Sequence, residues 1–236
     1  VGFYNLAWQL IIFPLSKINP IINKVAFPVY SKVQNDSATL NRYYTLNLKL
    51  LSLVTMPLLA FLMFFSSEVV GLVFGKGWET TASLLPILAL VGILKALGNP
   101  GGALILAKGR ADVGFWWNVV WAITIVIALA VGLWIKPSLY TAVYILLGLN
   151  LTVGAIWHVL IARIGEIQYL NLIIHFIKTF IAVILIAWLG STILNFYTIN
   201  NNFMNIILGS VICGALYILY LLAFEKKLMR TIREMR

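Results

Sequence analysis

The sequence is short of charged side chains. Only 10% of its 236 residues are Asp, Glu, Lys or Arg and 62% are apolar, whereas a typical soluble domain is about 25% charged and about 45–50% apolar. Seven acidic and 17 basic side chains are too few to cover the surface of a soluble globule of this length. They are enough to supply the loops of a membrane protein, and the composition therefore excludes an ordinary soluble domain.

Residue types that usually carry catalysis or bind metals are scarce as well. The single cysteine, Cys213, lies inside an apolar run, which excludes a disulfide framework and a cysteine-based metal site. His158 and His175 lie in different apolar runs without a nearby acid, and the sequence contains no Walker-type phosphate loop. Glu68 and Glu79 flank one predicted loop and do not form a catalytic acid pair. We therefore expect no metal site, no cofactor and no enzymatic activity.

Long apolar runs, in contrast, are abundant. Runs of about 20 residues bounded by charged or turn residues are typical of transmembrane helices. The strands of a transmembrane β-barrel would be about ten residues long and would alternate in polarity. The sequence therefore predicts an all-α, polytopic transmembrane helical bundle. Its seven spans are expected at residues 3–30, 44–65, 82–107, 113–135, 139–162, 170–189 and 203–224.

Basic residues predict how these spans are oriented. The net charge is +10, but the basic residues lie at the ends of apolar runs, which argues against a nucleic-acid partner. One set of alternate span ends holds Lys24, Lys32, Arg42, Lys49, Lys108, Arg110, Arg163, Lys226, Lys227, Arg230, Arg233 and Arg236, and the other holds Lys76 and Lys136. Because Lys and Arg are enriched in cytoplasmic loops, we expect a cytoplasmic C-terminus. Seven spans then place Val1 outside, and we expect further sequence upstream of it.

Two lysines lie midway along predicted spans, where a charge costs about 2.5–3.5 kcal/mol on insertion scales and usually faces a cavity or a partner. Lys17 lies among prolines, and Lys95 precedes a glycine–asparagine–proline sequence. Proline removes a backbone donor, and interrupted helix at membrane depth is tolerated where it lines a wet cavity. The predicted substrate-cavity residues are Lys17, Asn19, Asn23, Lys95 and Asn99, and the predicted helix breaks or hinges are Pro14, Pro20, Pro57, Gly98 and Pro100.

Other residues within the spans have simpler interpretations. Both mid-span lysines could instead pair with backbone carbonyls inside the bundle. Lys178 is nearer a cytoplasmic end and can extend to the interface. Trp116, Trp117 and Trp121 crowd the start of the fourth span, where packing or membrane anchoring explains them.

Several short motifs follow one another in an order that resembles a known family. They are GFYNLA at 2–7, VAFPVYS at 25–31, LVFGKGW at 72–78, GNPGG at 98–102, LAKGRAD at 106–112 and GFWWN at 114–118. This order resembles the Wzx-type polysaccharide and O-antigen flippases of the multidrug/oligosaccharidyl-lipid/polysaccharide (MOP) exporter superfamily. The final motifs most resemble the colanic acid exporter branch. The last three spans are similar to the family in hydropathy alone.

The resemblance implies a C-terminal part of a MATE-like, two-lobed bundle in the bacterial inner membrane. Residues 1–163 would form about five helices of the second lobe, residues 164–224 two additional helices, and residues 225–236 a basic cytoplasmic tail. Family members move oligosaccharide linked to undecaprenyl pyrophosphate from the cytoplasmic to the periplasmic leaflet by alternating access. Besides this substrate and membrane lipids, a polysaccharide polymerase is a candidate partner. Coupling to a proton or sodium gradient stays open.

Other transporter and membrane-protein classes compete with this interpretation. A MATE-type drug/cation antiporter would be expected to have acids within its spans, and here every acid lies in or beside a loop. A peptidoglycan lipid-precursor flippase also handles a pyrophosphate, so the charge of the cavity cannot separate it. A retinal pump needs a lysine and acidic counter-ions, but residues 203–224 contain no lysine or acid. A membrane polymerase or ligase would be expected to have a large external loop.

Overall fold

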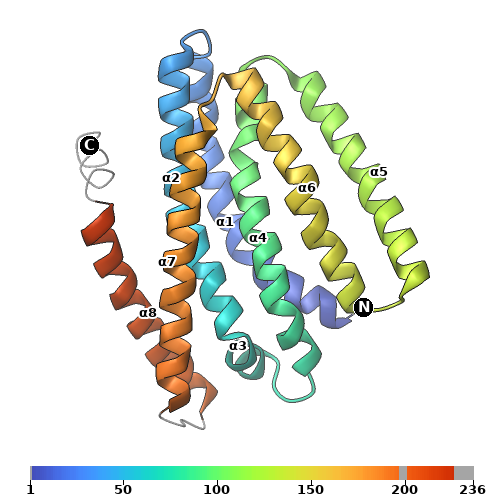
Figure 1. Ribbon diagram of the computed structural model, residues 1–236, viewed down its shortest axis with the longest axis vertical. Helices are drawn as coiled ribbons and strands as arrows, with labels where there is room; N and C mark the ends of the chain where they lie inside the picture. Colours follow the sequence, from blue (N-terminus) through green and yellow to red (C-terminus); the bar gives the residue numbers. More distant parts are fainter. Residues whose placement is uncertain (1, 197–200, 226–236) are drawn as a thin grey trace.

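A computed structural model describes residues 2–196 and 201–225, with the side chain of Asn195 left aside. The described residues form helices joined by short loops (Figure 1). The helices are α1 (Gly2–Lys32), α2 (Ser37–Phe64), α3 (Ser66–Val73), α4 (Glu79–Ala107), α5 (Ala111–Ile135), α6 (Leu139–Gly165), α7 (Tyr169–Phe196) and α8 (Asn202–Phe224). Apart from Glu225, the predicted basic tail lies outside the described residues.

All the helices except α3 are long and apolar enough to cross a membrane. Each of these seven coincides with a predicted span, so the all-α bundle of seven spans is confirmed. The short helix α3 was not predicted. It follows α2 after the single residue Phe65 and lies at the end of the bundle where α4 begins (Figure 1).

The prolines do not interrupt the helices. The backbone stays helical through Pro14 and Pro20 in α1, Pro57 in α2 and both Gly98 and Pro100 in α4. The prediction of helix breaks at these residues is therefore wrong, and their role as hinges stays a prediction. Each unpaired backbone group costs several kcal/mol in hydrocarbon. A continuous helix loses only the hydrogen bond that proline cannot make, whereas a broken helix would leave further backbone groups unpaired. Figure 1 shows α1 curving towards its N-terminal end, as proline-containing helices commonly do.

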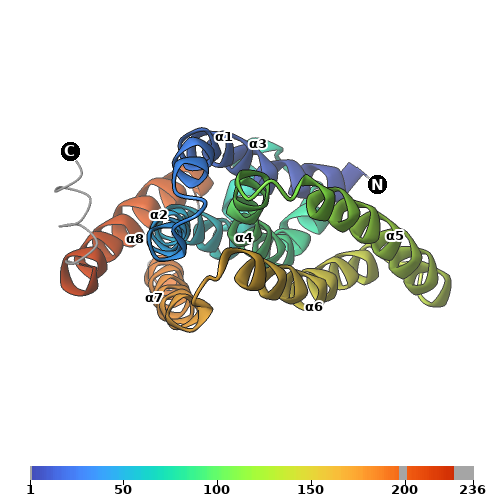
Figure 2. The same ribbon diagram turned by 90° about the horizontal axis from the view of Figure 1, so that it is seen from above.

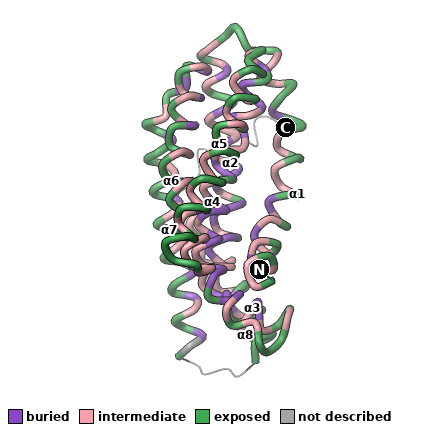
Figure 3. The backbone as a smooth tube through the Cα atoms, turned by 90° about the vertical axis from the view of Figure 1, so that its right-hand side faces the viewer, coloured by how far each residue is buried: buried purple, intermediate pink, exposed green. Residues whose placement is uncertain are grey.

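Helix α4 lies at the centre of the bundle (Figure 2). In its most apolar stretch 61% of the residues are buried, compared with 17% in α1 and none in α5. Buried positions run along α4 in Figure 3. At Gly92 an added Cβ would lie 2.5 Å from Cγ2 of Ile11 on α1 and 3.2 Å from Cδ1 of Leu59 on α2. A small residue therefore lets α1, α2 and α4 approach closely.

The end of the bundle where α1 meets α2 has a more polar core. The hydroxyls of Tyr44 and Tyr169 lie 2.8 Å apart, and Nδ2 of Asn47 donates to the Tyr30 hydroxyl at 2.7 Å. Asp36 is the N-cap of α2, and its Oδ1 accepts from the backbone N–H of Thr39. The Thr39 hydroxyl donates a second hydrogen bond to the same carboxylate. Together the two bonds hold the pKa of the exposed Asp36 carboxyl below its usual value.

The topology gathers basic residues at this same end. Lys32 ends α1, Lys108 and Arg110 follow α4, and Arg163 lies in the last turn of α6. The Lys108 ammonium donates to the carbonyl of Gln34 at 2.6 Å, joining the two loops. Lys76 lies between α3 and α4, and Figure 1 shows the loop that joins these helices at the opposite end of the bundle. The assignment of the basic end to the cytoplasm stays a prediction.

The close approach at Gly92 can be tested by adding one methyl group. We expect Gly92→Ala to lower the melting temperature of the detergent-solubilised protein, because overpacking costs about 1–3 kcal/mol and exceeds the helix-propensity gain of about 1 kcal/mol. Gly148→Ala on α6 is the control, since its Cβ would meet no atom within 4 Å. An unchanged or raised melting temperature for Gly92→Ala would contradict this packing.

Candidate functional site

Polar side chains follow one face of α1. Asn5, Gln9 and Ser16 are exposed and Asn23 is half-buried. At about 100° per residue, Asn5, Ser16 and Asn23 lie within about 20° of one another around the helix, and Gln9 lies within about 40° of them. We name these four residues the α1 polar stripe. Polar groups in a membrane-spanning helix usually face protein or a water-filled cavity rather than lipid.

The α1 polar stripe is joined to the central helix by a pair of asparagines. Nδ2 of Asn23 donates to Oδ1 of Asn99 on α4 at 2.6 Å. Lys95 lies one turn before Asn99, on the same face of α4, and its Nζ is 5.1 Å from the ring centroid of Trp8 on α1. That distance permits a cation–π interaction. The structure thus brings together three predicted site residues, Asn23, Lys95 and Asn99.

The other two predicted lining residues are placed differently. Lys17 is exposed and lies about 120° around α1 from Asn5, with its Nζ 5.8 Å from the ring centroid of Phe13. It therefore does not meet Lys95. Asn19 is half-buried, and its Oδ1, like Oδ1 of Asn23, is buried without a hydrogen-bond partner among the described residues. Buried polar atoms are normally hydrogen-bonded, so these two oxygens are available to a ligand or to water.

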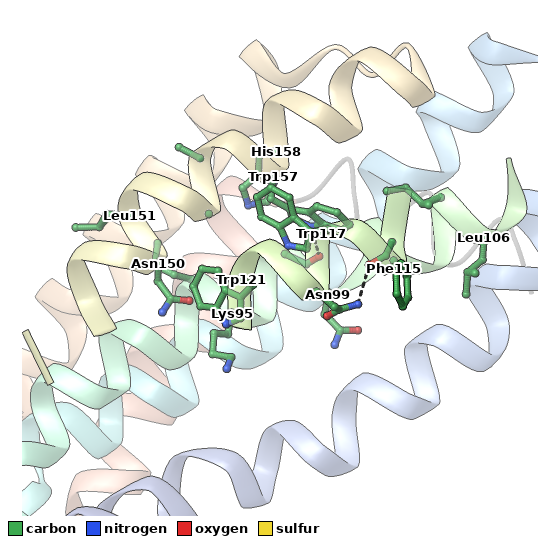
Figure 4. Close-up of a pocket in the computed structure, with 18 of the residues that line it drawn as sticks. Lys95, Asn99, Leu106, Phe115, Trp117, Trp121, Asn150, Leu151, Trp157 and His158 are labelled. Atoms are coloured by element: carbon green, nitrogen blue, oxygen red, sulfur yellow. Dashed lines mark hydrogen bonds between the residues drawn. The ribbon is translucent and has the colours of Figure 1, made fainter. Parts of the chain in front are cut away.

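A cavity of about 780 Å³ lies beside the asparagine pair, between α4, α5 and α6 (Figure 4). We name it the α4–α5–α6 cavity. Lys95 and Asn99 lie in its wall. Glycines of three helices also line it, and at Gly102 and Gly154 an added Cβ would meet no atom within 4 Å. Its volume is within the range of about 300–1,000 Å³ that is common for small-molecule sites.

Three tryptophans line this cavity, and none of them was predicted to be functional. Trp117 and Trp121 come from α5 and Trp157 from α6, whereas Trp116 is 63% exposed and does not line the cavity. The rings of Trp117 and Trp157 are 4.8 Å apart between centroids, and Nε1 of Trp157 donates to the carbonyl of Gly98 at 2.9 Å. Trp117 and Trp121 are four residues apart and therefore lie on one helix face. This spacing is the feature of the sequence that could have indicated a shared aromatic surface.

The side chains of this site favour binding over covalent chemistry. Within the described part of the chain, Lys95 has no ion-pair partner, and no three His, Cys, Asp or Glu side chains lie together as metal ligands. His158 lines the cavity with its Nδ1 3.3 Å from the hydroxyl of Tyr169. The cavity therefore offers one cation, several amides and aromatic faces, a combination that suits a polar ligand without positive charge.

Comparison with known proteins agrees with the motifs in the sequence. Residues 1–83 match the model of a family described as polysaccharide biosynthesis protein. The chain is 42% identical over 118 residues to the teichuronic acid biosynthesis protein TuaB of Bacillus subtilis, covering 50% of this chain and 24% of TuaB. It is 37% identical over 131 residues to the lipopolysaccharide biosynthesis protein WzxC of Escherichia coli, covering 56% of this chain and 27% of WzxC. The resemblance to Wzx-type polysaccharide exporters is confirmed.

Two further matches extend over almost the whole chain. The succinoglycan biosynthesis transport protein ExoT of Rhizobium meliloti is 23% identical over 241 residues, covering 99% of this chain and 48% of ExoT. The solved structure of the lipid II flippase MurJ in an inward closed conformation matches with a TM-score of 0.67 at 14% identity, covering 94% of this chain and 47% of MurJ. The MurJ likeness shows the fold. The chain spans half or less of the length of these relatives.

The asparagine pair between α1 and α4 can be tested by a double-mutant cycle. We expect Asn23→Ala and Asn99→Ala each to reduce the free energy of unfolding by about 1 kcal/mol, because each leaves a half-buried amide without its partner. The double variant should lose less than the sum of the two, with a coupling energy of at least about 0.5 kcal/mol. Unfolding in one detergent gives the values, and strict additivity would show that the two amides do not interact.

Proposed function

We propose that this chain forms part of the transport path of a flippase for lipid-linked oligosaccharide or polysaccharide repeat units in surface polysaccharide biosynthesis. One observation carries the proposal. Lys95 lies at mid-helix in a membrane-spanning segment, in the wall of a cavity that also holds asparagine amides, and has no ion-pair partner among the described residues. A cation placed there is costly unless it serves a ligand or faces water.

The chemistry of such a substrate fits the cavity. The headgroup of a polyprenyl-linked saccharide combines an anionic pyrophosphate with polar sugars, and its tail can stay in the lipid. A lysine at membrane depth lowers the cost of moving the phosphates through hydrocarbon, because an ammonium is a strong and flexible partner for phosphate oxygens. We propose undecaprenyl pyrophosphate as the carrier and the cytoplasmic-to-periplasmic direction. The names of TuaB, WzxC and ExoT support the saccharide part of the proposal.

The proposal includes a mechanism and a location. The fold matches about half of a MurJ chain, which supports one lobe of a two-lobed transporter that works by alternating access. We propose a transporter and no enzymatic activity.

The protein would lie in the bacterial inner membrane with its basic end in the cytoplasm. A polysaccharide polymerase remains a candidate partner. A drug/cation antiporter is disfavoured, because the lining of the cavity holds a lysine and no acid.

Removing the charge of Lys95 tests the proposal. We expect Lys95→Gln in the full-length protein to reduce surface polysaccharide at least tenfold, because hydrogen bonds to charged groups contribute about 1.5–3 kcal/mol and about 1.4 kcal/mol is a factor of ten. Lys95→Arg, which keeps the charge, should retain much of the export. The assay is complementation of a strain that lacks its own exporter, at equal membrane abundance of each variant.

A matched control separates this effect from the general loss of a positive charge. Lys136 lies exposed between α5 and α6, away from the cavity lining, so Lys136→Gln should export normally. Export at the wild-type level by Lys95→Gln would overturn the proposal. Lys17 is placed away from Lys95, and its contribution to the lining stays a prediction.

A further inference from the structure

The indole of Trp121 is an unused aromatic surface in the wall of the α4–α5–α6 cavity. Figure 4 shows it between Asn150 and Lys95. Among the described residues it makes no hydrogen bond and no ring contact, whereas Trp117 and Trp157 pack on each other. The Trp121 side chain is only partly buried, and its indole N–H is free within the described part of the chain. It therefore offers a ligand both an apolar face and a polar edge.

Two amides of the same wall are held in fixed positions. Nδ2 of Asn118 donates to the carbonyl of Gly114, and Nδ2 of Asn150 donates to the carbonyl of Leu146, both at 2.8 Å. Each bond ties the amide to its own helix, α5 or α6. Neither side-chain oxygen accepts a hydrogen bond within the described part of the chain. Both Oδ1 atoms are therefore acceptors in the same cavity wall as the indole.

We propose that Trp121, Asn118 and Asn150 form a saccharide-binding subsite of the α4–α5–α6 cavity. The inference rests on the proposed flippase function and adds to it the part of the cavity that holds a sugar ring. One face of a sugar ring is made of C–H groups and can pack on the indole, while its hydroxyls can donate to the two amide oxygens.

Other ligand classes fit this wall less well. A polyprenyl tail needs no amide groups, a phosphate is not attracted to amide oxygens, and an organic cation would be expected to have an acid nearby. A neutral ligand with many hydroxyls and an apolar face matches the indole and both oxygens at once. Because Lys95 and Trp121 line the same cavity, one headgroup can present its phosphate to the lysine and a sugar to the indole.

The space for the sugar comes from glycines. Gly154 of α6 lines the cavity, and an added Cβ there would meet no atom within 4 Å. Gly148, on the same helix, also has no atom within 4 Å of an added Cβ but does not line the cavity. At either position the first carbon of a side chain meets no atom of the protein, and only a side chain at Gly154 would enter the cavity.

Binding to the purified full-length protein tests the subsite directly. The probe is the oligosaccharide repeat unit released by mild acid from the surface polysaccharide of the source strain, measured by calorimetry. We expect Trp121→Ala to weaken its binding at least tenfold. Trp134→Ala is the matched control, since Trp134 is on the same helix, is 87% exposed and lies outside the cavity. Undecaprenyl phosphate, which has the lipid and the charge but no sugar, should bind equally to both variants and the wild type.

The glycine pair provides a second test that does not remove any contact. We expect Gly154→Leu to abolish binding of the released oligosaccharide and Gly148→Leu to leave it unchanged, with both variants keeping the wild-type melting temperature. Wild-type oligosaccharide binding by both Trp121→Ala and Gly154→Leu would overturn the subsite. A loss of undecaprenyl phosphate binding in Trp121→Ala would also overturn it, because the indole would then contact the lipid.

The export assay separates this inference from the proposed function. If Lys95→Gln stops export while Trp121→Ala and Gly154→Leu export normally, the flippase stands and the saccharide subsite is wrong. If Lys95→Gln also exports normally, the proposed function itself is wrong. We expect export to be lost in Lys95→Gln, Trp121→Ala and Gly154→Leu. We expect normal export in the controls Trp134→Ala and Gly148→Leu.

Discussion

The hydrocarbon interior of a membrane supplies no water to a polar group, and most features of this structure follow from that constraint. Every backbone amide must pair within its own helix, which explains why α1, α2 and α4 stay helical through their prolines. The same constraint makes each polar side chain within a span informative. Asn23 and Asn99 satisfy each other across α1 and α4, and Lys95 reaches the face of an indole.

The central position of α4 connects packing to function. Along its buried side, Gly92 lets α1 and α2 approach closely, and Lys95 and Asn99 follow on the same helix. Helix α5 borders the α4–α5–α6 cavity, which is also lined by glycines of α4, α5 and α6. Placing Lys95 and Asn99 on the most buried helix of the bundle holds these polar groups in defined positions.

The sequence predicts the spans well and the site in part. Apolar runs of membrane length identify α1, α2 and α4–α8 without any tertiary information. The sequence does not distinguish Lys17 from Lys95, since both lie at mid-span near proline, and only the packing of α1 on α4 separates them. Trp121 was assigned to packing or anchoring because α5 is apolar on all faces and its sequence does not show which face meets a cavity. Asn5 and Gln9 have a helical spacing that could have been found, whereas the short helix α3 has no span-length signal.

Transport of a lipid-linked saccharide by the full-length protein is the most direct test of this account. The protein is reconstituted into liposomes that contain a fluorescent undecaprenyl-pyrophosphate-linked oligosaccharide, and the fraction of headgroups accessible to a membrane-impermeant quencher is followed over time. We expect this lipid to cross between leaflets much faster with the protein than in empty liposomes, and undecaprenyl phosphate without sugar to cross more slowly. Movement of the sugar-bearing lipid at the rate of empty liposomes would contradict it.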